Sequence, residues 1–129
     1  MSTEMKRVLE IGYDAVLAKL PDALKTEGFG VLTEIDLRDT LKKKLDVDFR
    51  RYKILGACNP TLAHKALTAD LDIGVMLPCN VVVYENDDHK AVVSAIDPMQ
   101  TIAAQHPRLR EIAEDVRARL GRVLDQLSR

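Results

Sequence analysis

The sequence predicts an α+β fold: an antiparallel sheet of four to five strands covered by helices, in the approximate order strand, helix, four strands, helix, with short helical insertions. Three observations predict it. Residues 79–85 and 90–96 are apolar runs joined by a short polar loop, which indicates a hairpin and antiparallel pairing. The remaining helical patterns are too few and too uneven for a regular parallel series. The first and last long helices each carry one apolar stripe that can cover a sheet face.

Length and composition indicate one folded domain. The chain has 129 residues, of which 47% are hydrophobic and 30% are charged, as in ordinary globular proteins. Repeats, low-complexity tracts and Pro/Gly/Ser-rich linkers are absent from the sequence. We therefore expect one domain spanning residues 1–129.

Charge and hydropathy argue against nucleic acid and membranes as partners. The 19 basic and 20 acidic residues give a net charge of −1, so no global field attracts a polyanion. The one basic cluster, centred on Lys42, Lys43 and Lys44, lacks interleaved aromatics and is interpreted as a solvated face. The start of the chain is polar, and no apolar run approaches the ~20 residues that cross a bilayer. A cytoplasmic location is the resulting expectation.

The chain begins with a short element followed by a helix. Residues 4–11 are expected as a first strand, although their apolar spacing fits a helix equally well. Residues 13–27 predict a helix, because apolar residues recur every four positions and Gly28 can end it. Pro21 lies inside this pattern, which predicts either a kink near residues 17–20 or a helix restarted with Pro21 in its first turn.

The next segment predicts a strand and a short helix. Residues 30–36 alternate as a strand, which places Val31, Thr33 and Ile35 on one face. Asp36 can then cap a helix. The narrow apolar stripe of that helix comprises Leu37, Leu41 and Leu45.

The middle of the chain predicts a strand that leads directly into a capped helix. Residues 51–58 are rich in Tyr, Ile and Leu. Asn59 can accept hydrogen bonds at a helix start, and Pro60 lacks only a donor that the first turn leaves unpaired. The helix is expected over residues 60–69, and residues 72–77 fit either a helical turn or an extended approach.

The last third predicts the hairpin and the longest helix. Residues 86–89 form the polar loop between its two strands. Asp97 and Pro98 end the second strand, a partly helical link follows, and Pro107 opens the final amphipathic helix.

The two cysteines are the residues with the clearest chemical potential. If the strand ending at Cys58 pairs antiparallel with the strand beginning at Cys79, the two thiols are near neighbours. Cys58 also precedes a helix start, where amide donors and the helix dipole can lower the pKa of a thiol. Asp97 can bring a carboxylate to the same end of the sheet. The candidate residues of a ligand or redox site are Cys58, Asn59, Cys79 and Asp97.

Simpler interpretations of these residues stay open. Free cysteine is often a buried, small apolar side chain, and Asp97 is explained by a turn that ends a strand. Two thiolates are too few for a closed zinc site, so a metal would need His64, Asp97 or a second subunit. The sequence contains no phosphate-binding glycine loop after a strand and no catalytic constellation around a histidine.

Four stretches resemble the small bacterial and archaeal proteins grouped as domain of unknown function family 302. They are GFGVLTEID (28–36), ILGACNP (54–60), LPCNVVVYE (77–85) and IDP (96–98). The resemblance implies an antiparallel sheet packed under helices and a tendency to form homodimers. The family pattern points to Cys58, Asn59, Pro60, Pro78, Cys79, Asp97 and Pro98. The resemblance supplies no activity and no cofactor.

Two functional hypotheses follow. The first is a dimeric module that binds a small-molecule ligand, or performs thiol redox chemistry, at a site around Cys58 and Cys79. The alternative is a structural or interaction domain without catalytic activity, in which the sheet and the long helix provide an oligomer interface.

Overall fold

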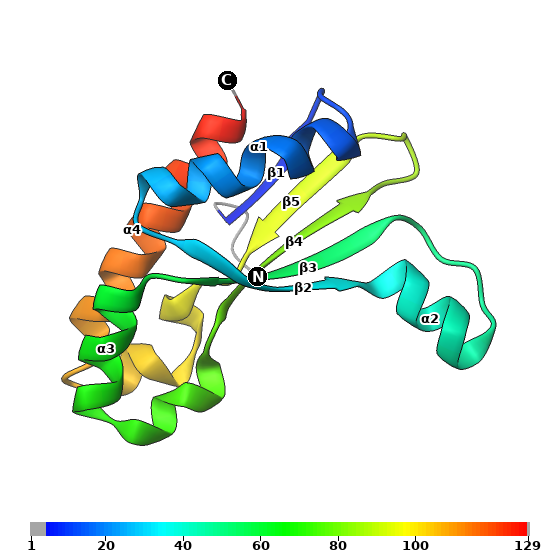
Figure 1. Cartoon of the computed structure of the whole chain (residues 1–129). Coiled ribbons are helices and arrows are strands. Elements are labelled where there is room, and N and C mark those ends of the chain that lie inside the picture. The colour runs from blue at the N-terminus through cyan, green and yellow to red at the C-terminus, as the bar shows by residue number, and fades with distance from the viewer. Residues whose placement is uncertain (1–4, 129) are drawn as a thin grey trace.

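The computed structural model describes residues 5–128, which form one five-stranded antiparallel sheet with helices packed on one face (Figure 1). The predicted α+β class is confirmed. The strand order is β1-β5-β4-β3-β2. The strands are β1 (Lys6–Leu9), β2 (Gly30–Asp36), β3 (Tyr52–Cys58), β4 (Cys79–Glu85) and β5 (Ala91–Ala95). The α-helices are α1 (Tyr13–Thr26), α2 (Leu37–Leu45), α3 (Pro60–Ala69) and α4 (Arg110–Leu127). The 3-10 helices are η2 (Leu71–Met76), η3 (Pro98–Gln100) and η4 (Ile102–Gln105).

The first and last long helices cover the sheet, as predicted. Figure 1 shows α1 and α4 side by side, and both contact the strands. Leu20 and Leu24 of α1 and Leu120 and Leu124 of α4 are at most 1% exposed. Their side chains belong to one apolar cluster with the alternate strand residues that face the helices. Burial of this cluster supplies the main favourable free energy of folding.

The hairpin of β4 and β5 confirms the antiparallel prediction, with Val83 paired to Val93. β1 adds an outer strand against β5. The short strand expected near the N-terminus is therefore present, but it spans Lys6–Leu9, and the predicted start at Glu4 lies outside the described residues.

α1 is one continuous helix through Pro21, so the predicted restart at this proline is wrong. Proline removes one backbone donor, which leaves the carbonyl of Leu17 without its intrahelical partner. Pro21 is exposed, whereas Val16, Leu20 and Leu24 are fully buried. Packing of the buried face thus outweighs the local cost of proline on the solvent side.

β2 contains a bulge that corrects the predicted alternation. Val31 pairs with Ala57 and Thr33 with Gly56, so Leu32 is an extra residue relative to β3. A one-residue insertion moves the following side chains to the other face. Val31 therefore packs against the main core, whereas Thr33 lies on the opposite face beside Gly56.

A second, smaller apolar cluster lies under the short helices. Its buried members are Ala66, Ile73 and Leu109. Residues 72–77, left open between helix and extended structure, lie mostly in η2, and α4 begins at Arg110 rather than at Pro107. The link between β3 and β4 and the segment before α4 therefore share a small core, beside the end of the sheet where Cys79 lies.

Candidate functional site

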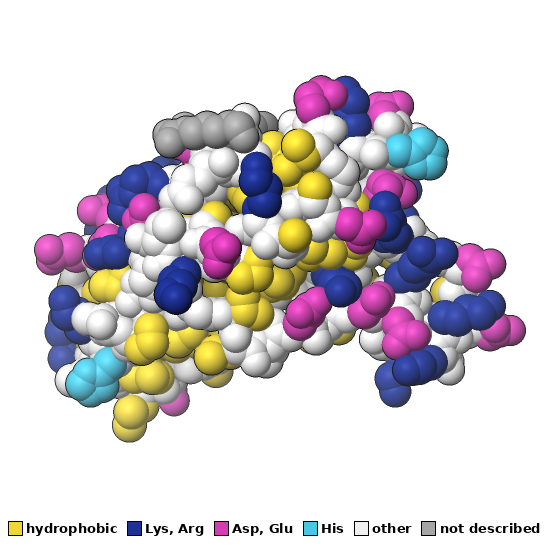
Figure 2. All heavy atoms as spheres, turned by 45° about the horizontal axis from the view of Figure 1, so that its top comes forward, with side chains coloured by type: hydrophobic (Ala, Val, Ile, Leu, Met, Phe, Trp, Pro, Cys, Tyr) yellow, Lys and Arg dark blue, Asp and Glu magenta, His cyan; other side chains and the backbone are white. Residues whose placement is uncertain are grey.

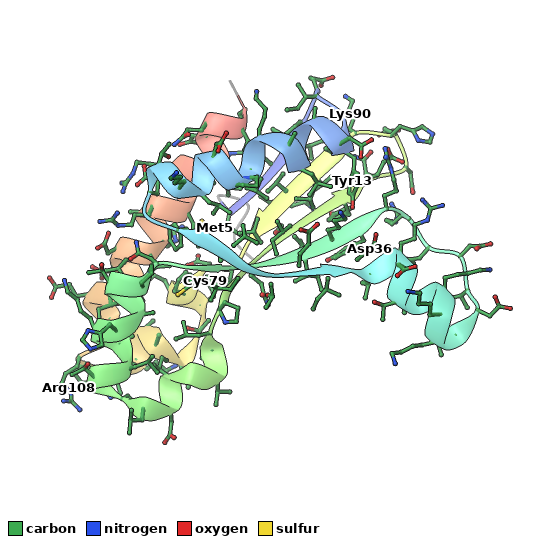
Figure 3. The ribbon with its side chains drawn as sticks, viewed as in Figure 1. Met5, Tyr13, Asp36, Cys79, Lys90 and Arg108 are labelled. Carbon is green, nitrogen blue, oxygen red and sulfur yellow. The ribbon has the colours of Figure 1, made fainter. Side chains whose placement is uncertain are left out.

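The two cysteines lie at the same end of the sheet. β3 and β4 are antiparallel with Ala57 opposite Cys79, so the end of β3 lies beside the start of β4. Both thiols are free. Both residues line a small cavity of about 50 Å³ beneath α3 and α4. Figure 3 places Cys79 in the interior, far from Tyr13 and Asp36 at the other end of the sheet.

The surroundings of Cys79 oppose thiolate chemistry. It lies on the helix-covered face and packs against the main apolar cluster. Burial, and secondly the neighbouring Cys58, raise the pKa of the Cys79 thiol to about 11. A thiol with this pKa is protonated at neutral pH, and the protonated form is a poor nucleophile and metal ligand.

Asn59 has a structural role at the start of α3. Its side-chain oxygen accepts a hydrogen bond from the Leu62 amide at 3.2 Å, and its Nδ2 donates to the Glu27 carbonyl at 3.2 Å. Gly28 has a φ of 83°, and a Cβ there would lie 2.9 Å from Nδ2 of Asn59. Asn59 therefore caps α3 and ties it to the end of α1.

Asp97 does not share the cysteine cavity. Its buried carboxylate accepts hydrogen bonds from the Met99 amide at 2.9 Å and from Nε of Arg117 at 3.0 Å. Asp97 and Arg117 line a different pocket, on the outer side of α4. Asp97 thus follows β5 at the same end of the sheet as the thiols, since the Ile96 amide donates to the Asn80 carbonyl at 3.0 Å, but its side chain is held outside the cysteine cavities.

An apolar cavity of about 60 Å³ adjoins the cysteine cavity. The two share Ala66, Cys79 and Ile112 among their lining residues. The lining of this apolar cavity has two side chains that can donate a hydrogen bond, those of Cys79 and Thr101. The Thr101 hydroxyl already donates to the Pro98 carbonyl at 2.6 Å. The arrangement can hold an apolar group and offers it almost no polar contact.

Comparison with known proteins places the chain in a family. A sequence profile described as "Domain of unknown function DUF302" matches residues 5–127. The chain belongs to the DUF302 family. Its structure is similar to the crystal structure of an uncharacterized conserved DUF302 protein from Bacillus stearothermophilus, with a TM-score of 0.84, 33% identity and 96% of each chain covered. No protein among those with curated functions matches the chain.

Sequence reasoning missed most of the cavity wall of this DUF302 chain. Ile73 lies in a 3-10 helix, Ala103 in the link after the last strand, and Leu109 just before α4. These segments lack helical or strand periodicity, so their apolar residues gave no sign of a shared cavity. The one signal in the sequence that could have indicated this cavity was the number of apolar residues in the short segments that link the main helices and strands.

The other polar candidates form no metal site. No group of three or more His, Cys, Asp or Glu side chains that could hold a metal occurs within residues 5–128. His64 is exposed on α3.

No helix within residues 5–128 is long and apolar enough to cross a membrane.

Two of the three lysines in the basic run on α2 are paired with carboxylates. Nζ of Lys42 lies 3.0 Å from Asp46, and Nζ of Lys43 lies 3.0 Å from Asp39. Figure 2 shows acidic and basic side chains interspersed over this end of the molecule. Mixed charge of this kind supports the interpretation of a solvated face.

Proposed function

We propose that this DUF302 protein binds a small apolar ligand in the cavities beside Cys79. The observation that carries the proposal is the almost wholly apolar wall, built where α3, α4 and the short helices meet the sheet. Ligand pockets are concave and mainly apolar, with few polar groups. Together the two cavities suit a group the size of a short alkyl chain.

The energetics favour occupancy by an apolar group. The apolar wall of this pocket of about 60 Å³ lacks dispersion contacts while it is unfilled, which costs free energy. A ligand that fills it recovers part of this free energy through dispersion contacts. Water is a poor occupant, since it needs two to four polar partners and the wall offers almost none.

Ligand binding is favoured over thiol redox chemistry for this site. Redox and nucleophilic cysteines are partly exposed and have lowered pKa values. The Cys79 thiol has its pKa raised to about 11 by burial and by Cys58. The two thiols then act as polarizable wall atoms for the ligand.

Xenon is a suitable probe of the cavities because it is apolar and small. Under xenon pressure, we expect saturable methyl ¹H–¹³C shifts at Ile73, Ile112 and Val116, which lie on the cavity walls. Ala66→Leu places a larger side chain at a position that lines both cavities and should abolish these shifts.

Ala18→Leu is the matched control, since Ala18 is an exposed alanine on α1 away from the cavities. It should leave the xenon shifts unchanged. Absence of saturable shifts in the wild-type chain, or equal shifts in the Ala66→Leu protein, would remove the ligand-binding proposal.

A second candidate function, homodimer assembly, is supported by the sheet face opposite α1 and α4. On that face Val8 is 55% exposed and Ile35 is 45% exposed. Between them, Tyr52 and Tyr84 are stacked with ring centroids 5.3 Å apart. We propose a second copy of the chain as the partner. In a two-fold symmetric dimer the same apolar face is buried on both subunits, and a net charge of −1 on each chain causes little repulsion between them.

Solution mass tests this assembly. Light scattering after size exclusion should give twice the mass of one chain. Ile35→Glu should shift the protein to the monomer mass, because it buries a carboxylate in an apolar interface. Leu71→Glu changes a leucine that is 82% exposed in η2 and should leave the dimer intact. A monomeric wild-type chain at micromolar concentration would contradict the proposal.

A further inference from the structure

A polar pocket of about 220 Å³ lies at the end of the sheet away from the cysteines. The first turn of α1, the junction of β2 and α2, and the start of β3 surround it. Figure 3 places Tyr13 and Asp36 at this end. The charged and hydroxyl side chains in its lining are Tyr13, Asp14, Asp36, Arg38, Arg51 and Lys53. A pocket of this volume is large enough for a small organic ligand and is not limited to a single water molecule.

Tyr13 has a buried ring, and its hydroxyl reaches the pocket, because no buried side-chain oxygen or nitrogen among the described residues lacks a hydrogen-bond partner. The residue is 4% exposed, and its hydroxyl makes no hydrogen bond to any residue in the described part of the chain, so it is open to a ligand in the pocket. The Arg51 guanidinium lies 4.6 Å from the ring centroid, which fixes the ring by a cation–π contact. Burial, and secondly the charge of Asp36, raise the pKa of Tyr13 to about 12. The hydroxyl therefore stays protonated and able to donate.

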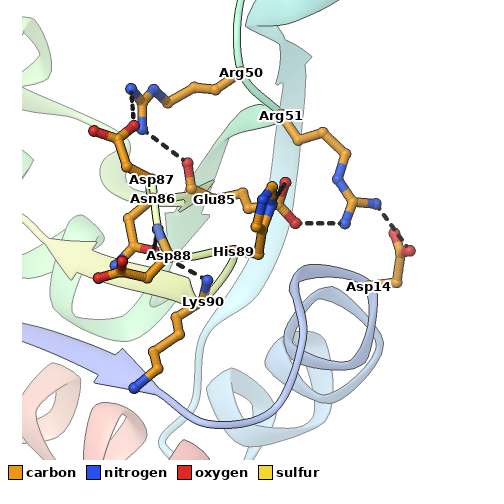
Figure 4. Close-up of polar contacts among 9 residues, drawn as sticks. All are labelled: Asp14, Arg50, Arg51, Glu85, Asn86, Asp87, Asp88, His89 and Lys90. Carbon is orange, nitrogen blue, oxygen red and sulfur yellow. Dashed lines mark hydrogen bonds and ion pairs between the residues drawn. The ribbon is translucent and has the colours of Figure 1, made fainter.

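Two of the three cations around the pocket are held by carboxylates. Arg51 donates to Asp14 at 3.0 Å and to Glu85 at 2.8 Å (Figure 4). Nζ of Lys53 lies 2.9 Å from Oε1 of Glu34. These pairs already satisfy the charges of Arg51 and Lys53.

Arg38 is the cation left for a ligand. It makes no ion pair with any of the residues 5–128. Its planar guanidinium matches the two oxygens of a carboxylate. Asp14 and Asp36 in the same wall repel a second negative charge, which disfavours a phosphate dianion relative to a monoanion. The first turn of α1 has no side-chain cap, so it also favours an anion nearby.

We infer that this pocket binds a small monocarboxylate, with Arg38 pairing to the carboxylate and the Tyr13 hydroxyl donating a hydrogen bond to it. The site is separate from the apolar cavities, so either proposal can fail without the other.

Sodium propionate is the probe, titrated into the full chain and followed by ¹H–¹⁵N NMR at constant ionic strength. Saturable shifts are expected at the amides of Tyr13, Arg38 and Lys53. Tyr13→Phe keeps the ring but removes the hydroxyl, and it should weaken binding about tenfold. Arg38→Gln removes an exposed charge without touching the core, and it should weaken binding by at least as much.

Arg50→Gln is the matched control, because Arg50 pairs with Asp87 outside the pocket. It should leave propionate binding unchanged. Shifts that equal those in sodium chloride, or unchanged affinity in both the Tyr13→Phe and Arg38→Gln proteins, overturn the inference. Tighter binding of inorganic phosphate than of propionate overturns the assignment to a monocarboxylate.

Discussion

Leu120→Ala is expected to lower the free energy of unfolding by about 2–5 kcal/mol. Leu120 lies in the middle of α4, is fully buried, and belongs to the main cluster with Leu24 of α1 and Val93 of β5. Truncation removes apolar contacts and leaves a cavity that the packed helices and sheet can fill only in part. Urea unfolding followed by circular dichroism measures the change.

Leu71→Ala is the control for this substitution. Leu71 is 82% exposed at the start of η2, so its truncation should change the unfolding free energy by about 0.5 kcal/mol or less. A similar loss at both positions would show that α4 does not pack on the sheet as described. That outcome would also remove the basis for the cavities beneath α4.

Gly56→Ala should destabilise the protein by about 1–3 kcal/mol through overpacking. Gly56 lies in β3 opposite Thr33, and an added Cβ would collide with Oγ1 of Thr33 and lie 2.6 Å from Cγ of Pro78. The Thr33 hydroxyl can rotate away, but the Pro78 ring is fixed to its own backbone, so relief requires the segment at Pro78 or β3 to move. Thermal unfolding of the purified variant measures the effect.

Gly30→Ala is the control in the neighbouring strand. A Cβ at Gly30 has no atom within 4 Å, so this change should be neutral or slightly stabilising. Combining Gly56→Ala with Thr33→Ala removes one of the two collisions and should recover part of the loss. Equal stability of the Gly56→Ala and Gly30→Ala proteins would contradict the close approach of β2, β3 and Pro78.

Local sequence signals predicted the features that depend on neighbouring residues. The Asn59 and Asp36 caps hydrogen-bond to amides three residues ahead, and both are present. The hairpin loop after β4 is likewise a local turn. Of the two alternatives predicted for Pro21, a kink before it or a restarted helix, the restart is wrong, because burial of the opposite face of α1, a tertiary effect, outweighs a local propensity.

The candidate site was predicted only in part. Antiparallel pairing of β3 and β4 was inferred from the order of the strands, and it brings Cys58 and Cys79 to one end of the sheet. Asp97 was grouped with them because it follows the last strand at that end, yet Arg117 from α4 holds its carboxylate outside the cysteine cavities. An ion pair between residues distant in the chain leaves no trace in local spacing.

The sequence by itself determined the α+β class, the helix caps, the hairpin and the apolar faces of α1 and α4, because each rests on periodicity or on contacts within a few residues. Only the tertiary structure decided the bulge in β2, the cavity walls beside Cys79 and the polar pocket around Tyr13. These features arise where segments far apart in the chain meet, and their geometry depends on packing that no single segment encodes.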